Sequence, residues 1–161
     1  MSRLDRLGPA KDVAQVAAAI GREFPYTLLA AVAGKPEVEL NSALDRLIAA
    51  GLLFRQGTPP HASYLFKHAL VQDAAYSTLL REPTRVLHAR IAEILESQFA
   101  ETAESQPELL ARHYTKADLI DKSARLWSKA GLRSQERSAL VEAAEQLGHA
   151  LALFAPDLPA A

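Results

Sequence analysis

Residues 64–76 constrain the fold of this chain more than any other stretch of its sequence. They open with the run Tyr64-Leu65-Phe66, which is typical of a strand, and continue into an apolar run from Ala69, which is typical of a helix. Lys67 and His68 separate the two runs. The sequence therefore predicts a strand that turns directly into a helix, with a lysine and a histidine at the corner.

Three helices are predicted upstream of this corner. Apolar residues recur at helical spacing over residues 13–20, 26–32 and 36–50. Each segment is closed by a glycine, a residue that commonly ends helices because it adopts the left-handed conformation without strain: Gly21, Gly34 and Gly51.

A hairpin is predicted between the third helix and the corner. Two short strand-like runs, residues 52–55 and 63–66, flank the glycine- and proline-rich residues 57–61, a strong turn signal. Three helices followed by a hairpin predict a winged helix-turn-helix. The hairpin would be the wing, and residues 70–80 would form the helix that follows it.

Only helices are predicted after residue 82. Pro83 suits the first turn of a helix whose apolar face continues to Phe99, and residues 101–106 form a polar break. Periodicity is lost again in the tail, residues 155–159. Between the break and the tail, three more helices are expected at residues 108–116, 119–133 and 139–154.

The last two of these helices resemble one tetratricopeptide helix pair. Small residues that let helices approach and large ones that fill the groove lie at matching positions: Trp127, Ala130, Gly131, Ala143, Leu147 and Ala150. One repeat cannot bury its own apolar face. We therefore expect this unit either to pack on the helices before it or to start an array cut off at Ala161.

The order of elements and the Lys67-His68 corner resemble the winged-helix region that follows the nucleotide-binding core in STAND-type ATPases, signalling relatives of AAA ATPases. The resemblance covers residues 2–80 well and the rest loosely. It extends to bacterial proteins that carry an adenylate or guanylate cyclase, or a transcription-factor domain, on the same chain. The fold class it implies is mostly α: a tail of a preceding helix (1–7), a winged-helix domain with a small β-hairpin wing (8–82), and an α-helical tetratricopeptide-like domain (83–161).

His68 stands where plant and animal members of that family carry the histidine of a Met-His-Asp motif, with Lys67 and Ala69 replacing the Met and Asp. In the family this histidine contacts the phosphate of bound ADP and holds the ATPase closed. The resemblance implies the same nucleotide-sensing role for His68, and Lys67 could approach a phosphate beside it. An imidazole suits the role because it donates hydrogen bonds to phosphate oxygens. The alternative is a histidine that only satisfies backbone groups at a strand end.

Motifs of catalysis or nucleotide binding are missing from the chain. A phosphate-binding loop needs Gly-x-x-x-x-Gly-Lys followed by Ser or Thr, and the nearest sequence, Gly34-Lys35-Pro36, does not meet that pattern. The histidines occur singly, without the i, i+4 spacing of metal ligands on a helix: His61, His68, His88, His113 and His149. We predict no enzymatic activity, metal or cofactor in this chain, with ADP or ATP bound elsewhere in the parent protein.

Charge argues against a polyanionic partner. The 18 basic residues nearly balance the 19 acidic ones. The segment in the place of a DNA-recognition helix, residues 36–50, carries Glu37, Glu39 and Asp45 against Arg46 alone. The N-terminus is too charged for a signal peptide, and no apolar run of about eighteen residues could span a bilayer. We expect a cytoplasmic protein that binds neither nucleic acid nor membrane.

These features predict a non-catalytic regulatory section of a multidomain signalling ATPase, linked to a cyclase or a transcription regulator. Its winged helix would clamp the nucleotide-bound ATPase core of the same parent chain, and its helical repeats would bind a protein partner. The alternative is a stand-alone winged-helix transcription regulator with a helical dimerisation domain. The acidic third helix favours the first interpretation.

Overall fold

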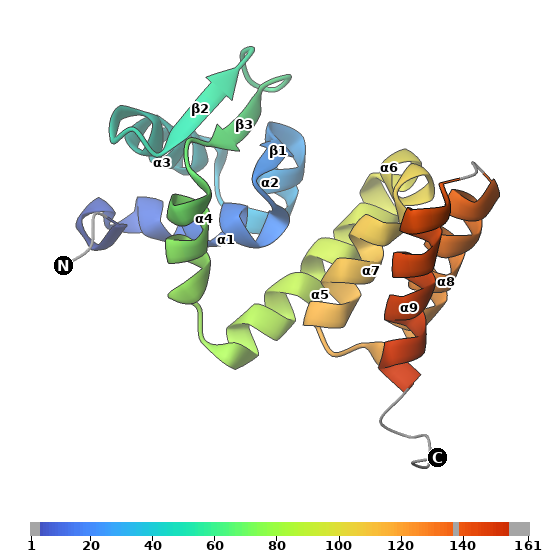
Figure 1. The fold of residues 1–161 in the computed structure, drawn as a ribbon. Coiled ribbons are helices and arrows are strands. Elements are labelled where there is room, and N and C mark those ends of the chain that lie inside the picture. Colours follow the sequence, from blue (N-terminus) through green and yellow to red (C-terminus); the bar gives the residue numbers. More distant parts are fainter. Residues whose placement is uncertain (1–3, 137–138, 155–161) are drawn as a thin grey trace. The chain divides into compact units, whose positions relative to one another are not determined.

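The computed structural model describes residues 4–136 and 139–154, which form mostly helices and one small sheet (Figure 1). This confirms the mostly α fold class. The elements, in chain order, are η1 (Leu4–Leu7), α1 (Pro9–Ile20), β1 (Glu23–Pro25), α2 (Tyr26–Ala33), α3 (Glu37–Ala49), β2 (Leu53–Gln56), β3 (Ser63–Phe66), α4 (Ala69–Ser77), α5 (Arg81–Gln98), α6 (Ala100–Ser105), α7 (Pro107–Lys116), α8 (Ile120–Glu136) and α9 (Leu140–Phe154). No helix among them is long and apolar enough to cross a membrane.

The chain divides into two compact units, one up to Leu87 and one from His88. The predicted boundary, between residues 82 and 83, and the observed one both fall within α5. Of the predicted N-terminal tail, Leu4–Leu7 form the 3-10 helix η1, in which Leu4 is buried. Residues 1–3 of that tail and the predicted aperiodic stretch at 155–159 lie outside the described residues.

The core of the first unit forms where the apolar faces of its helices meet. Each helix contributes side chains that are almost wholly shielded from solvent, among them Val13 of α1, Leu29 of α2 and Leu40 of α3. Burying one such side chain stabilises a fold by about 1.5–3 kcal/mol. The apolar periodicity that predicted these helices is therefore the periodicity of the core they share.

A three-stranded antiparallel sheet lies beside these helices, in the order β1-β3-β2. The predicted hairpin of β2 and β3 is present, and the third strand, β1, was not expected. β1 pairs with β3 on its other side, with Phe24 opposite Tyr64. The rings of these two residues stack with centroids 5.8 Å apart, and Phe66 packs against Phe24 at 6.1 Å. This aromatic cluster packs β1 against β3, and Tyr64 also contacts Tyr26 of α2, with ring centroids 6.5 Å apart.

The second unit is helical throughout the part of it that the structure describes. Trp127 of α8 lies in a buried cluster with Ala111 of α7 and Ala150 of α9. Its indole Nε1 donates to Thr115 Oγ1 (3.2 Å), so the one polar atom of the side chain is satisfied. The polar break predicted at residues 101–106 is wrong, because Ala100–Ser105 forms α6, a helix with no buried residue.

Candidate functional site

The corner predicted from the sequence lies at one end of the sheet, where the central strand β3 leaves it. The amide of Phe66 donates to the carbonyl oxygen of Arg22 (2.9 Å), and the amide of Lys67 donates to that of Leu52 (3.0 Å). Lys67 and His68 therefore lie beside the segments that lead into both outer strands, β1 and β2. Three parts of the chain that are far apart in sequence meet at this point.

His68 is the residue immediately before α4, and its side chain is exposed. Its backbone is extended (φ −136°, ψ 139°), and its side chain makes no hydrogen bond that caps the helix. Its carbonyl oxygen accepts from the amides of Val71 (3.0 Å) and Gln72 (3.4 Å), so the backbone alone starts the helix. The imidazole is thus directed neither into the core nor to the helix start, and it lies where the partial positive charge of the helix end favours anions.

Lys67 is partly buried, and its ammonium lies over the ring of Phe54, 4.7 Å from the centroid. Phe54 is 50% exposed, and a cation–π contact at such a site contributes about 0.5–1 kcal/mol. The same ammonium lies near Gly51, where the chain leaves α3 for β2. The contact holds the lysine side chain on the hairpin of β2 and β3.

Two residues of this corner were not recognised from the sequence. Arg22 is exposed, and its backbone carbonyl oxygen accepts a hydrogen bond from the amide of Phe66 at the end of β3. Phe54 supplies the ring beneath Lys67. Neither could be found without knowing that β1 exists and how β2 pairs, because both residues reach the corner through strand pairing.

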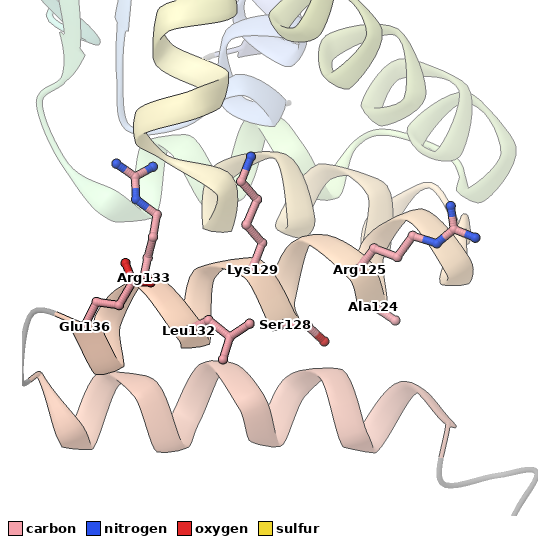
Figure 2. A pocket seen from close by; sticks show the side chains of 7 residues that line it. All are labelled: Ala124, Arg125, Ser128, Lys129, Leu132, Arg133 and Glu136. Carbon is pink, nitrogen blue, oxygen red and sulfur yellow. The ribbon is translucent and has the colours of Figure 1, made fainter.

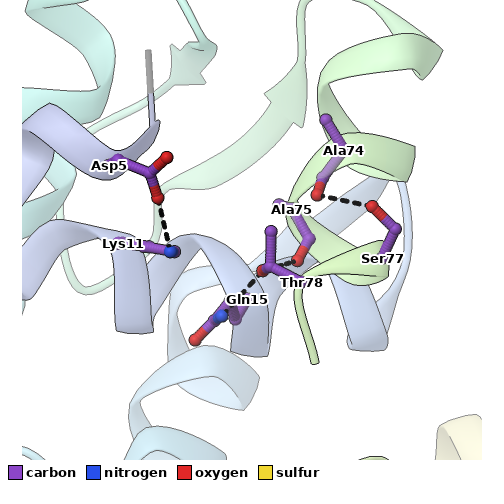
Figure 3. Close-up of polar contacts among 7 residues, drawn as sticks. All are labelled: Asp5, Lys11, Gln15, Ala74, Ala75, Ser77 and Thr78. Atoms are coloured by element: carbon purple, nitrogen blue, oxygen red, sulfur yellow. Dashed lines mark hydrogen bonds and ion pairs between the residues drawn. The ribbon is translucent and has the colours of Figure 1, made fainter. Parts of the chain in front are cut away.

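Side-chain hydrogen bonds hold α4 against α1 and so support the corner (Figure 3). Gln15 Nε2 of α1 donates to Thr78 Oγ1, just after α4, at 2.7 Å, and Thr78 Oγ1 donates in turn to the carbonyl of Ala75 at 2.6 Å. Gln72 Nε2 donates to the carbonyl of Ala18 at 3.1 Å. The helix that follows His68 is therefore anchored along its length, while Leu70 in its first turn is 79% exposed.

The face that a winged helix would offer to DNA is poor in unpaired cations. Glu37 and Glu39 occupy the first turn of α3 and are exposed. Arg55 of β2 lies 3.4 Å from Asp45 of α3, so its charge is partly compensated within the chain. Backbone phosphates require lysines and arginines that can approach them. This surface supplies few.

The structure also brings together two histidines that appeared isolated in the sequence. His88 of α5 and His113 of α7 are 4% and 5% exposed, and their Nδ1 atoms lie 2.9 Å apart. Burial lowers the pKa of each from 6.5 to about 4, with further lowering by Lys116 at His88, and by His88 and then Arg112 at His113. With both rings neutral, one Nδ1–H can donate to the other Nδ1. No group of three His, Cys, Asp or Glu residues that could hold a metal occurs in the described part of the chain.

Comparison with known proteins gives little beyond sequence kinship. No protein-family profile matches the chain, and no solved structure matches it. An uncharacterized protein of Rhizobium meliloti (strain 1021), R02095, is 36% identical over 155 residues, which are 94% of this chain and 15% of that protein. The chain thus spans about 15% of the length of the relative it matches.

Proposed function

We propose that this chain is a non-catalytic regulatory section of a multidomain signalling ATPase, in which the corner at His68 senses the bound nucleotide. The first unit would be a winged helix that docks on the ATPase core of the same parent chain. His68 would donate a hydrogen bond to a phosphate of ADP held by that core. The second, tetratricopeptide-like unit would bind a protein partner, and the cyclase or transcription-regulator output would lie elsewhere in the parent.

The observation that carries this proposal is the exposure of His68 at the start of α4. A histidine that served only the local fold would cap the helix or be buried, whereas this side chain does neither. Lys67 precedes it in the chain, the backbone of Arg22 is hydrogen-bonded to Phe66 two residues before it, and a phosphate favours basic side chains near a helix N-terminus. The length of the Rhizobium relative also supports the idea that such a section belongs to a larger protein.

The alternative, a winged-helix transcription regulator, receives less support. It would need α3 or the wing to present cations to DNA, yet the first turn of α3 is acidic and Arg55 lies beside Asp45. Winged helices also serve as protein-docking modules, so the architecture alone does not separate the two functions. The charge of these surfaces favours docking on a protein.

The test is retention of ADP by the full-length protein carrying His68→Ala. Loss of one charge-assisted phosphate contact costs about 1.5–3 kcal/mol, so ADP should bind about tenfold to a hundredfold more weakly, and basal signalling should rise. His61→Ala is the matched control, because His61 is also exposed and lies in the turn between β2 and β3. Unchanged ADP retention in the His68 variant would refute the sensor role.

A second measurement guards against an indirect effect. In the 161-residue chain alone, His68→Ala should leave the melting temperature unchanged, because the side chain is exposed and caps nothing. A large fall in the melting temperature, together with normal ADP retention by the full-length protein, would assign His68 a structural role instead.

A further inference from the structure

A groove lies along α8 in the second unit (Figure 2). Its volume is about 570 Å³, and the described residues that line it all come from this one helix: Ala124, Arg125, Ser128, Lys129, Leu132, Arg133 and Glu136. Six of them form two parallel rows, one small or apolar and the other basic, and Glu136 adds an acidic side chain four residues after Leu132.

The first row is Ala124, Ser128 and Leu132, spaced four residues apart along one face of the helix. Leu132 is 55% exposed, although the same helix buries Trp127 on its other side. Ala124 is 1% exposed and thus already covered, whereas the partly buried Ser128 and the exposed Leu132 leave room for a second helix to approach and give it an apolar contact.

The second row, Arg125, Lys129 and Arg133, places three cations four residues apart, where like charges repel one another. Glu104 of α6 contacts two of them. Lys129 Nζ lies 3.2 Å from its carboxylate, and Arg133 Nη1 donates a hydrogen bond to its backbone carbonyl oxygen. Arg125 has no ion pair among residues 4–136 and 139–154. In Figure 2 the Lys129 and Arg133 side chains extend together, whereas Arg125 extends separately from a different part of the helix.

We propose that this groove binds an amphipathic helix with an acidic edge, supplied by a protein partner. Leucine-type side chains of the partner would cover Leu132, and carboxylates at four-residue spacing would pair with the basic row, beginning with Arg125. A nucleic acid would use the cations but not the apolar row, so the combination favours a peptide. The inference rests on the part of the proposed function that gives the second unit a protein partner, and it does not involve His68.

The experiment measures the fluorescence anisotropy of labelled model peptides titrated with the 161-residue chain. The probe is a peptide of about 15 residues with leucines at helical spacing and glutamates along one edge. It should bind, and both Arg125→Glu and Leu132→Asp should weaken binding at least about tenfold. Arg112→Glu is the matched control, because Arg112 is exposed on α7, does not line the groove and gives the same change of charge.

Several outcomes would overturn the proposal. Equal loss in the Arg112 and Arg125 variants would reduce the effect to general charge attraction. Equal binding of a peptide with lysines in place of the glutamates would show that the groove does not select an acidic partner. Binding of single-stranded RNA but not of the acidic peptide would show that the partner is not a peptide. Self-association of the chain in sedimentation, abolished by Leu132→Asp, would assign the groove to a second copy. If the peptide does not bind but His68→Ala weakens ADP retention by the full-length protein, the groove proposal is wrong and the nucleotide-sensing proposal is unaffected.

Discussion

Leu147 of α9 lies directly against Gly131 of α8. A Cβ atom built on Gly131 would lie 2.5 Å from Leu147 Cγ and 3.2 Å from the Leu147 backbone nitrogen. The first value is shorter than real Cβ contacts, and the second is tighter than most of them and involves a backbone atom that cannot rotate away. The two helices therefore approach each other as closely as they do only because position 131 has no side chain.

Gly131→Ala should consequently destabilise the second unit by about 1–3 kcal/mol, in spite of the higher helix propensity of alanine. Gly148→Ala is a matched control on α9, since a Cβ atom there would meet nothing within 4 Å. That change should stabilise the chain by about 0.5–1 kcal/mol. Urea unfolding of the two variants measures both effects, and a stabilising Gly131→Ala would contradict the close contact.

The buried pair of His88 and His113 predicts a loss of stability in mild acid. Both pKa values are lowered in the fold, so between pH 6.5 and about 4 the unfolded chain binds more protons than the folded one. The contribution is fully present above pH 6.5 and is lost as the pH falls toward 4. Each histidine contributes up to about 3 kcal/mol to this change.

Unfolding free energies measured from pH 7 to pH 4 test this prediction. Replacing both histidines by leucine should flatten the curve between pH 6.5 and 4, because the two titrating groups are gone. Both are replaced together so that neither is left as a buried polar group without its partner. His61→Ala, which changes an exposed histidine, should leave the curve as it is. An unchanged slope in the double variant would assign the acid sensitivity to other groups.

The chain should not bind duplex DNA at physiological salt. The reason is the acidic first turn of α3 and the proximity of Asp45 to Arg55. Asp45→Ala should increase any residual, non-specific binding by removing that neutral pairing. Electrophoretic shifts with a random duplex measure both, and binding tighter than about 1 μM by the unaltered chain would favour the transcription-regulator alternative.

The 161-residue chain alone should give no heat on calorimetric titration with ADP or ATP and magnesium. The sequence contains no phosphate-binding loop, and a single histidine with neighbouring basic residues cannot hold a nucleotide without the core that binds its base and sugar. A micromolar dissociation constant would show that this chain carries its own nucleotide site.

Most of the helices were predictable because each buries an apolar face, as α3 does with Leu40, Leu44 and Leu47. β1 was not, because three residues ending in Pro25 are too short to show a period of two. α6 was not predicted for a different reason. Its residues are mostly polar and none is buried, so no apolar face indicates a helix.

The candidate site was predictable only in part. Lys67 and His68 could be placed at a strand-to-helix corner, because the change of pattern lies within one continuous segment. Arg22 and Phe54 reach it from other strands, and His88 meets His113 across 25 positions of sequence. Contacts between distant segments depend on how elements pack, which local periodicity does not encode.

β3 is the middle strand of its sheet, and this position has a consequence for the energetics of docking. Its last residues are hydrogen-bonded to the segments on both sides, and α4 fixes the chain immediately after His68. A surface loop loses conformational entropy when a ligand orders it, and that loss subtracts from affinity. The backbone of His68 has already lost its freedom on folding, so the proposed phosphate contact would restrict only the rotation of one imidazole.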